Sequence, residues 1–158
     1  MIFVTVGTQL PFDRLIRAVD EIAPHLNGER IIAQTNGGEH IVKNIEYRRY
    51  FSAVEFNSLI SQSRLIVSHA GTGSIISAMI HEKPIIIMPR RASLGEHRNE
   101  HQLATARKMD ELKFVNVAYN EQQLRDLILN DNIKNSHFLS DKAPRELVDS
   151  IVNFILEQ

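Results

Sequence analysis

The sequence predicts an α/β fold in which helices flank a parallel sheet, and three observations support this prediction. Short β-branched runs alternate along the chain with segments of helical period. The run Pro84–Met88 is continuously apolar, as expected of a strand that is buried on both faces. A turn of small and polar residues, His69–Ser74, joins another apolar strand to a helix. Parallel sheets bind ligands beside such turns, so the pattern that predicts the fold also predicts a site.

The elements of the first half follow from apolar periodicity and from turn residues. The first strand is expected at Ile2–Val6, and Pro11 suits the first turn of the helix that follows it. Apolar residues then keep a helical period until Pro24 and Asn27-Gly28 end that helix. The next elements are expected to be a strand at Ile31–Gln34, a weaker strand at Tyr50–Val54, a short helix at Phe56–Ile60 and a strand at Leu65–Ser68.

The second half continues the alternation of helices and strands. The helix Thr72–His81 is expected to bury Ile75, Ile76, Met79 and Ile80. The elements expected after it are the strand Pro84–Met88, a loop at Pro89–Glu96, a helix at His97–Met109, a strand at Phe114–Val117, a helix at Glu121–Leu129, a loop at Asp131–Asp141 and a last helix at Pro144–Ile155. No internal repeat or boundary interrupts the chain, so residues 1–158 are predicted to form a single domain.

The composition excludes several classes of function. Eighteen basic and nineteen acidic residues leave a net charge of −1, which gives no global attraction to nucleic acid or to anionic lipid. The pairs Arg48-Arg49 and Arg90-Arg91 are expected to be solvated at the surface. The chain has no cysteine, its start lacks the pattern of a signal peptide, and no apolar run is long enough to span a membrane. We therefore expect a soluble, cytoplasmic protein.

The turn after Leu65–Ser68 is a candidate phosphate site. Gly71 and Gly73 allow a ligand to approach the backbone, and the free N–H groups of the following helix attract anions. The third glycine of a dinucleotide fingerprint is replaced by Ile76, and no Walker lysine follows. Thr72 and Ser74 either donate to a phosphate or act as an ordinary N-cap. His69 either contacts the ligand or bonds the backbone at the strand end.

Two further loops are expected at the same edge of the sheet. Gly7-Thr8-Gln9 follows the first strand, and Glu96–Gln102 follows the strand Pro84–Met88. In the second loop Asn99, His101 and Gln102 offer neutral donors and acceptors of the kind that recognise sugar hydroxyl groups. His97 and His101 also match the H-x-x-E-H pattern of a class of zinc peptidases, provided that they share one helix face. The sequence offers no obvious third zinc ligand at a spacing that would indicate a metal site. A zinc hydrolase is therefore the weaker alternative.

Taken together, these motifs resemble the C-terminal, nucleotide-sugar-binding domain of family 28 glycosyltransferases. The matching segments are Phe3–Thr8, Ser68–Ser74, Lys83-Pro84 and Asn99–Gln102, and the resemblance extends to about residue 130. The chain is most similar to a small single-domain subfamily. That subfamily is typified by the catalytic subunit of the dolichol-linked N-acetylglucosaminyltransferase and by bacterial exopolysaccharide counterparts.

The resemblance implies a Rossmann-like domain that forms one half of a GT-B architecture and binds a UDP-sugar. Thr8, Gly71, Thr72, Gly73 and Ser74 would hold the diphosphate, and His101 and Gln102 would reach the sugar or the diphosphate. Phe51 and Ser52 would lie near the base. Ser77 stands where family members often carry an acidic residue that holds the ribose, so ribose recognition departs from the family pattern. No cofactor or metal is implied, because protein donors and a helix dipole can stabilise the leaving diphosphate.

The family also implies a division of labour between two proteins. A GT-B enzyme reacts in the cleft between two such domains, and in the single-domain subfamily a membrane-anchored partner provides the acceptor half. We therefore expect the catalytic subunit of a heteromeric, inverting glycosyltransferase of exopolysaccharide synthesis. It would transfer a hexose or N-acetylhexosamine to a lipid-linked acceptor, at the inner face of the membrane, with a general base that the partner can supply. The alternative is a non-catalytic nucleotide-sugar-binding or regulatory subunit, which Ser77 favours.

Overall fold

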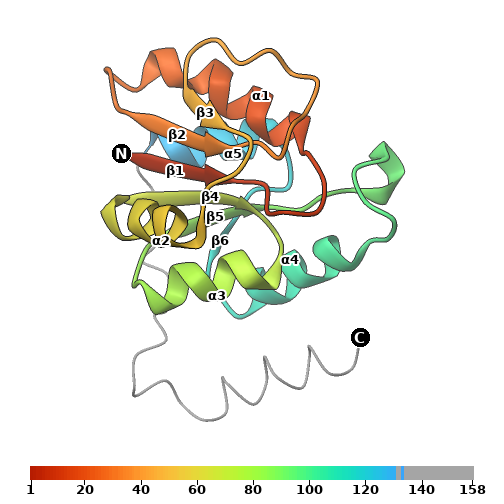
Figure 1. The fold of residues 1–158 in the computed structure, drawn as a ribbon. Coiled ribbons are helices and arrows are strands. Elements are labelled where there is room, and N and C mark those ends of the chain that lie inside the picture. The colour runs from red at the N-terminus through yellow and green to blue at the C-terminus, as the bar shows by residue number, and fades with distance from the viewer. Residues whose placement is uncertain (131–132, 134–158) are drawn as a thin grey trace.

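A computed structural model describes residues 1–130 and 133 of the chain. In this part of the chain one parallel sheet has the strand order β3-β2-β1-β4-β5-β6 (Figure 1). The strands are β1 (Ile2–Thr5), β2 (Ile31–Gln34), β3 (Glu46–Arg48), β4 (Leu65–His69), β5 (Ile85–Met88) and β6 (Asn116–Val117). The α-helices are α1 (Asp13–Ile22), α2 (Ala53–Gln62), α3 (Thr72–Ile80), α4 (His101–Glu111) and α5 (Glu121–Leu129), with short 3₁₀ turns at Ala23–His25 and Ala92–Leu94.

Helices cover both faces of the sheet, and each face has its own apolar core. Alternate residues of a strand point to opposite faces, so Ile2 and Val4 pack with Leu15 of α1 and Leu124 of α5. Phe3, between them in the sequence, packs on the other face with the core side chains of α2, α3 and α4. Figure 1 shows α1 and α5 on one side of the sheet and α2, α3 and α4 on the other. The predicted α/β fold, with helices flanking a parallel sheet, is confirmed.

The strand order reverses direction between β1 and β4. From β1 the chain moves outward to β2 and β3, and it then returns to place β4 on the other side of β1. This is the strand order of the Rossmann fold, whose ligands bind outside the carboxyl ends of the strands at the point of reversal. The loops that follow β1 and β4 are therefore the first place to look for a site.

Two predicted elements are misplaced, and one residue predicted to be buried is exposed. The weak strand is Glu46–Arg48 instead of Tyr50–Val54, because Ser52 and Glu55 form a capping box that begins α2. Helix α4 begins at His101 and not at His97, since the segment before it forms bends. Ile80 is 62% exposed, because α3 turns its inner stripe of Ile75, Ala78 and Met79 to the sheet. The loop Asp131–Asp141 and the last helix lie outside the described residues, apart from residue 133.

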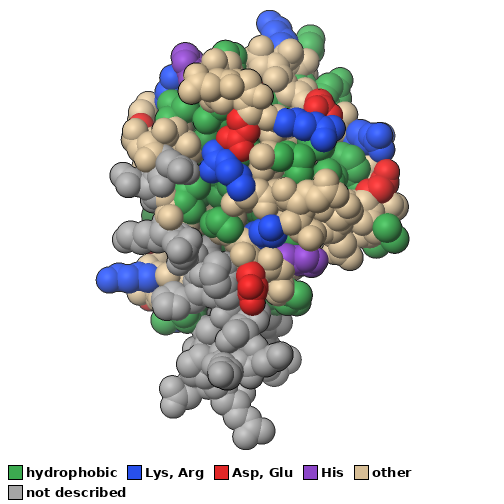
Figure 2. All heavy atoms as spheres, turned by 90° about the vertical axis from the view of Figure 1, so that its left-hand side faces the viewer, with side chains coloured by type: hydrophobic (Ala, Val, Ile, Leu, Met, Phe, Trp, Pro, Cys, Tyr) green, Lys and Arg blue, Asp and Glu red, His purple; other side chains and the backbone are tan. Residues whose placement is uncertain are grey.

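The face at the amino ends of the strands carries paired charges. Figure 2 shows basic and acidic side chains interspersed there with apolar ones. Glu29 accepts ion pairs from the N-terminal amine at 3.1 Å and from Arg64 at 2.6 Å, and Arg30 pairs with Glu46 at 2.7 Å. Because these positive and negative charges are paired, this face is neither predominantly positive nor predominantly negative. In the part of the chain that the structure describes, no helix has the length and apolar character of a membrane span.

Candidate functional site

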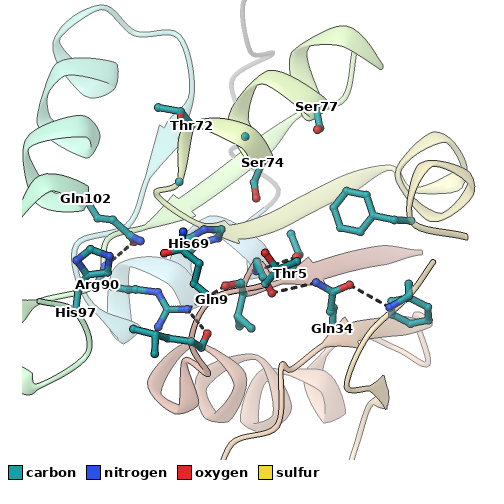
Figure 3. A pocket seen from close by; sticks show the side chains of 18 of the residues that line it. Thr5, Gln9, Gln34, His69, Thr72, Ser74, Ser77, Arg90, His97 and Gln102 are labelled. Carbon is teal, nitrogen blue, oxygen red and sulfur yellow. Dashed lines mark hydrogen bonds between the residues drawn. The ribbon is translucent and has the colours of Figure 1, made fainter. Parts of the chain in front are cut away.

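A cavity of about 620 Å³ lies at the carboxyl ends of the strands, where β1 and β4 diverge. It is lined by the loop after β1, the end of β2, the start of α2, the turn between β4 and α3, and the loop after β5 (Figure 3). The lining residues are Thr5, Val6, Gly7, Thr8, Gln9, Leu10, Gln34, Phe51, Ala53, Phe56, Asn57, His69, Gly71, Thr72, Gly73, Ser74, Ser77, Arg90, His97 and Gln102. The three loops predicted to surround one crevice do meet there.

The start of α3 presents free backbone donors to this cavity. Gly71 is the N-cap, and no side chain caps the helix, which rules out the N-cap role for Thr72 and Ser74. The first intrahelical bond runs from the Ile75 N–H to the Gly71 carbonyl at 3.3 Å, so the N–H groups before it have no partner within the helix. A Cβ on Gly73 would meet no atom within 4 Å. The helix start is therefore open to an anion.

His69 is enclosed between the two glycine loops. A Cβ on Gly7 would lie 2.8 Å from its Cε1, and a Cβ on Gly71 would lie 2.3 Å from its Nε2, so both positions require glycine. Gly7 also has a positive φ of 76°, which favours glycine independently. Nδ1 lies 3.2 Å from the Ser68 hydroxyl, and a hydrogen bond with the Thr5 backbone adds to the contacts. The ring bonds the backbone at the strand end and also lines the cavity, and its contact with a ligand stays a prediction.

Burial, reinforced by the positive charge of Arg90, lowers the pKa of His69 to about 4. The imidazole is therefore neutral at physiological pH. A neutral ring at the centre of the cavity can donate one hydrogen bond without placing a second positive charge beside Arg90.

Arg90 corrects the prediction of a solvated arginine pair. Its side chain is 2% exposed, and its guanidinium donates to three carbonyl groups of the loop that follows β1. The acceptors are Val6 at 2.9 Å, Leu10 at 2.6 Å and Pro11 at 2.5 Å. The guanidinium also stacks on Phe12, 4.7 Å from the ring centroid. Burial lowers the pKa of Arg90 to about 10, so the group stays charged at neutral pH.

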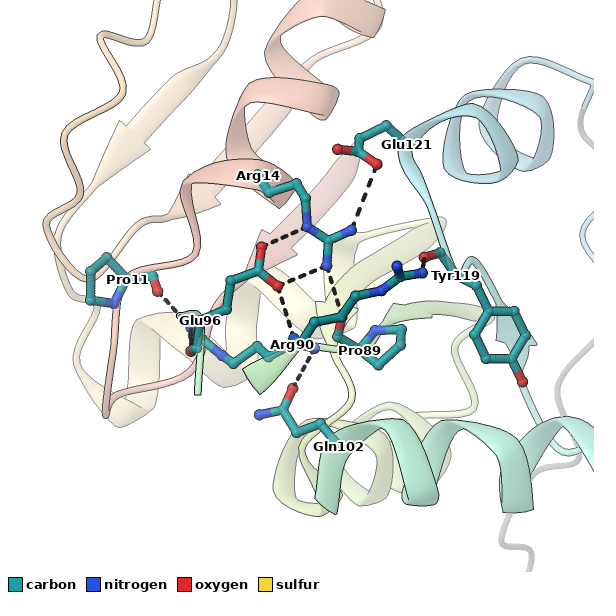
Figure 4. A network of polar contacts seen from close by, with 9 residues as sticks. Pro11, Arg14, Pro89, Arg90, Glu96, Gln102, Tyr119 and Glu121 are labelled. Carbon is teal, nitrogen blue, oxygen red and sulfur yellow. Dashed lines mark hydrogen bonds and ion pairs between the residues drawn. The ribbon is translucent and has the colours of Figure 1, made fainter. Parts of the chain in front are cut away.

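A network of contacts ties the loop after β5 to the rest of the site (Figure 4). Glu96 accepts two bonds from Arg14 of α1, at 2.6 and 2.9 Å, and a third from the Arg91 backbone at 2.9 Å. The Arg90 backbone N–H donates to Gln102 at 3.2 Å, which positions that side chain at the start of α4. Arg91 donates to the Tyr119 carbonyl at 2.7 Å, so this arginine is also not simply solvated.

The end of the cavity away from Gln102 is lined by aromatic side chains and by the amide of Gln34. Gln34 donates to the Gly7 carbonyl at 3.1 Å and accepts from the Phe51 N–H at 3.2 Å, so it joins the loop after β1 to the start of α2. Phe51 and Phe56 line this end together with Ser77. Figure 3 places Gln34 and Ser77 at one end and His97 and Gln102 at the other, with His69 between them.

Arg90 is the only arginine, lysine, aspartate or glutamate among the described residues that line the cavity. Its charge and the helix start of α3 act in the same direction, because a helix N-terminus carries a partial positive charge. The absence of a carboxylate from this lining leaves an anion unopposed. The cavity therefore suits a ligand with a negatively charged centre.

Seven of the nine predicted site residues line the cavity: Thr8, His69, Gly71, Thr72, Gly73, Ser74 and Gln102. Asn99 and His101 do not, because the late start of α4 leaves them outside it, with Asn99 accepting from the His101 N–H at 3.2 Å. Phe51 lines the cavity, whereas Ser52 caps α2. Sequence reasoning missed Arg90 and Gln34. Polar residues at the carboxyl ends of buried strands were the signal that would have found them.

The zinc alternative requires His97 and His101 on one helix face. His97 precedes α4, so the pair does not have that geometry. Among the described residues, no group of three or more histidine, cysteine, aspartate or glutamate side chains is arranged to hold a metal ion.

Comparison with known proteins identifies the family. The profile of the glycosyltransferase family 28 C-terminal domain matches residues 1–152. The chain belongs to this family. The predicted resemblance to this family is thereby confirmed.

The relatives and solved structures agree with the assignment. The chain is 33% identical over 104 residues to the UDP-N-acetylglucosamine transferase subunit ALG13 of Candida albicans, covering 64% of this chain and 34% of that protein. It therefore spans about a third of the length of this relative. The solution structure of an ALG13 has a TM-score of 0.60 at 23% identity and covers 86% of this chain and 88% of its own. The calicheamicin glycosyltransferase CalG4 has a TM-score of 0.58 at 16% identity, covering 99% of this chain and 43% of its own. Both structures confirm the predicted fold, a Rossmann-like half of a GT-B architecture.

Replacing Arg90 by Lys should lower the free energy of unfolding by about 2–3 kcal/mol, because one ammonium cannot serve carbonyl groups that lie on different sides of a guanidinium. Amide exchange of residues 7–10 should accelerate in the same variant. Urea denaturation and hydrogen exchange measure the two effects. Arg98→Lys, at an exposed position of the following loop, is the control. Equal stability of the two variants would contradict the anchoring role of Arg90.

His69 should make stability depend on pH. Its folded pKa of about 4 lies below the ordinary value of 6.5, so the unfolded chain binds the proton first and stability falls as pH drops from about 6.5 to 4. The loss attributable to this group is at most about 3 kcal/mol. Urea denaturation at pH 7.5 and pH 4.5 should show a smaller difference for His69→Asn than for the parent protein. An identical difference in both proteins would show that His69 titrates normally.

Proposed function

We propose that this chain is the UDP-sugar-binding catalytic subunit of a glycosyltransferase that works together with a second protein. The observation that carries the proposal is the uncapped start of α3, which opens into a cavity whose lining holds one charged side chain, Arg90, and no carboxylate among the described residues. A diphosphate is the part of a UDP-sugar that such a site would hold. The name of the Candida relative, a UDP-N-acetylglucosamine transferase subunit, supports the same ligand class.

The order of side chains along the cavity gives the proposed orientation of the donor. The uracil ring would lie at the aromatic end with Phe51 and Phe56, where a planar base can stack. The diphosphate would lie at the start of α3, near Thr8 and the ring of His69. The sugar would then extend toward Gln102, whose amide can bond hydroxyl groups.

A partner would provide the second wall of the reaction cleft. A donor site on one domain leaves the acceptor unplaced, and proximity of the acceptor provides much of the rate in such reactions. The polar loops around Thr8, Thr35–Glu39 and Arg90–Glu96 would face that partner. A membrane-anchored partner would bring a lipid-linked acceptor and recruit this chain to the inner face of the membrane, as in exopolysaccharide synthesis.

The alternative of a non-catalytic nucleotide-sugar-binding subunit is favoured by one observation. Ser77 lines the cavity at the position where an acidic residue would hold the ribose. A hydroxyl group can still accept and donate to a ribose hydroxyl, but the bond is weaker than one with a carboxylate. The alternative predicts UDP binding without turnover in the complex.

Gly73→Leu should weaken UDP binding at least about tenfold and leave the fold intact. The new side chain meets no protein atom near Cβ, so it projects into the space at the helix start, while leucine is the better helix former. Calorimetry with UDP in metal-free buffer measures the affinity. Gln122→Leu is the matched control, because it makes an exposed leucine at the same position in the first turn of α5. Equal UDP affinity in Gly73→Leu and in the parent protein would falsify the assignment of this turn.

The isolated chain should bind UDP but transfer no sugar. Transfer to a lipid-linked acceptor should appear when the chain is co-purified with its membrane-associated partner from the native host and given a panel of UDP-sugars. A product detected only in the complex supports the catalytic role. UDP binding by a complex that turns over no donor supports the non-catalytic alternative, and transfer by the isolated chain at the full rate would exclude partner dependence.

A further inference from the structure

We propose that His97 is the general base that takes the proton of the acceptor hydroxyl group. This inference rests on the proposed function and assigns a catalytic residue within the same site. It places the proton-transfer step on this chain, although the acceptor itself comes with the partner.

The first support is the make-up of the cavity wall. No aspartate or glutamate of the described residues lines the cavity, so a carboxylate base is absent from this part of the site. Histidine is the side chain that most often transfers protons in enzymes, and two histidines, His69 and His97, belong to the lining. His69 is a poor candidate, because it is enclosed between Gly7 and Gly71 in the middle of the cavity.

The second support is the position of His97. Figure 3 shows its ring at the end of the cavity that also holds Gln102, away from Gln34 and Ser77. A donor with its base at the aromatic end and its diphosphate at the start of α3 would place its sugar at this end. The anomeric carbon and the incoming hydroxyl group would therefore lie near His97.

The third support is the tautomer that the neighbouring asparagine selects. The His101 backbone N–H donates to the Asn99 side chain at 3.2 Å, which identifies the accepting atom as the carbonyl oxygen Oδ1. The same oxygen lies 3.0 Å from Nδ1 of His97, and this contact favours the tautomer in which Nδ1 carries the proton and donates it. The Asn99 backbone N–H also points to Nδ1 from 3.4 Å, a longer contact in which Nδ1 would accept. In the tautomer that the shorter contact favours, the lone pair resides on Nε2, which is then free to accept a proton.

The proposed step is a single displacement at C1 of the donor sugar. The acceptor O–H gives its proton to Nε2 of His97, and the acceptor oxygen forms a bond to C1 of the sugar. The bond between C1 and the β-phosphate oxygen breaks, and its electron pair leaves with UDP. Attack from the face opposite UDP inverts the configuration at C1. The imidazolium that remains returns its proton to solvent after the product departs.

The test uses the complex co-purified with the tagged chain. In His97→Gln, the turnover number for sugar transfer should fall by a factor of about 100 to 10,000, the usual contribution of a general base, while the affinity for UDP stays unchanged. His25→Gln, on the exposed 3₁₀ turn far along the chain, is the control and should keep full activity. In His97→Gly, added imidazole should restore part of the turnover, which a structural role would not allow.

The outcomes separate this role from the proposed function. Unchanged turnover in His97→Gln, in a complex that binds UDP, overturns the role of His97 and assigns the base to the partner. Lost turnover that falls together with UDP affinity, or that imidazole does not restore, makes His97 a structural residue and also overturns the role. Failure of the parent complex to bind UDP would instead overturn the proposed function itself.

Discussion

The site depends on one buried guanidinium. Arg90 follows β5, and it holds the loop after β1 by donating to the carbonyl groups of Val6, Leu10 and Pro11. Unpaired buried carbonyl groups and an unpaired buried charge are both costly, so each side of this contact requires the other. Because the two loops come from strands on either side of β4, the contact fixes the width of the cavity between them.

The same contact sets the electrostatics of the cavity. Arg90 places a permanent positive charge behind the loop that contains Gly7 and Thr8, and its field favours the neutral form of His69. The helix start of α3 faces the same space from the opposite side. A ligand with a negative centre is then stabilised from two directions by groups that need not move to receive it, which is the property that makes preorganised donors effective in catalysis.

Other loops are anchored by carboxylates that are buried or partly buried. The loop between β2 and β3 lies against α1, where Asp20 accepts from the N–H groups of Lys43 and Asn44 and contacts His40 at 3.2 Å. Asp13 accepts from the Glu39 N–H at 3.0 Å. Glu96 holds the loop after β5 through Arg14. The carboxylates near the site thus bond to the scaffold, which explains why none of the described ones is available in the cavity lining.

Periodicity and strand spacing were enough to predict a parallel sheet, except for the position of its edge strand β3, and the three loops that meet at its edge. These features depend on where apolar residues recur, which is local information. The start of α4 and the roles of Arg90 and Gln34 depend on partners distant in sequence, such as the carbonyl group of Val6 for Arg90. A polar residue next to a strand end looks the same in sequence whether it is solvated or buried, and only the packed structure decides between the two.

The chemistry of the cavity is asymmetric in a way that the fold explains. Residues at the strand ends and at the helix start supply hydrogen-bond donors and a positive charge, which would stabilise the leaving diphosphate of the proposed reaction. A group that accepts a proton is disfavoured in that environment, because burial and the positive charge of Arg90 both oppose protonation, and together they lower the pKa of His69 to about 4. The proposed base, His97, lies at the Gln102 end of the cavity and not between the two glycine loops that enclose His69. In the proposed reaction, binding of the leaving group and activation of the acceptor would thereby take place at different points of the cavity.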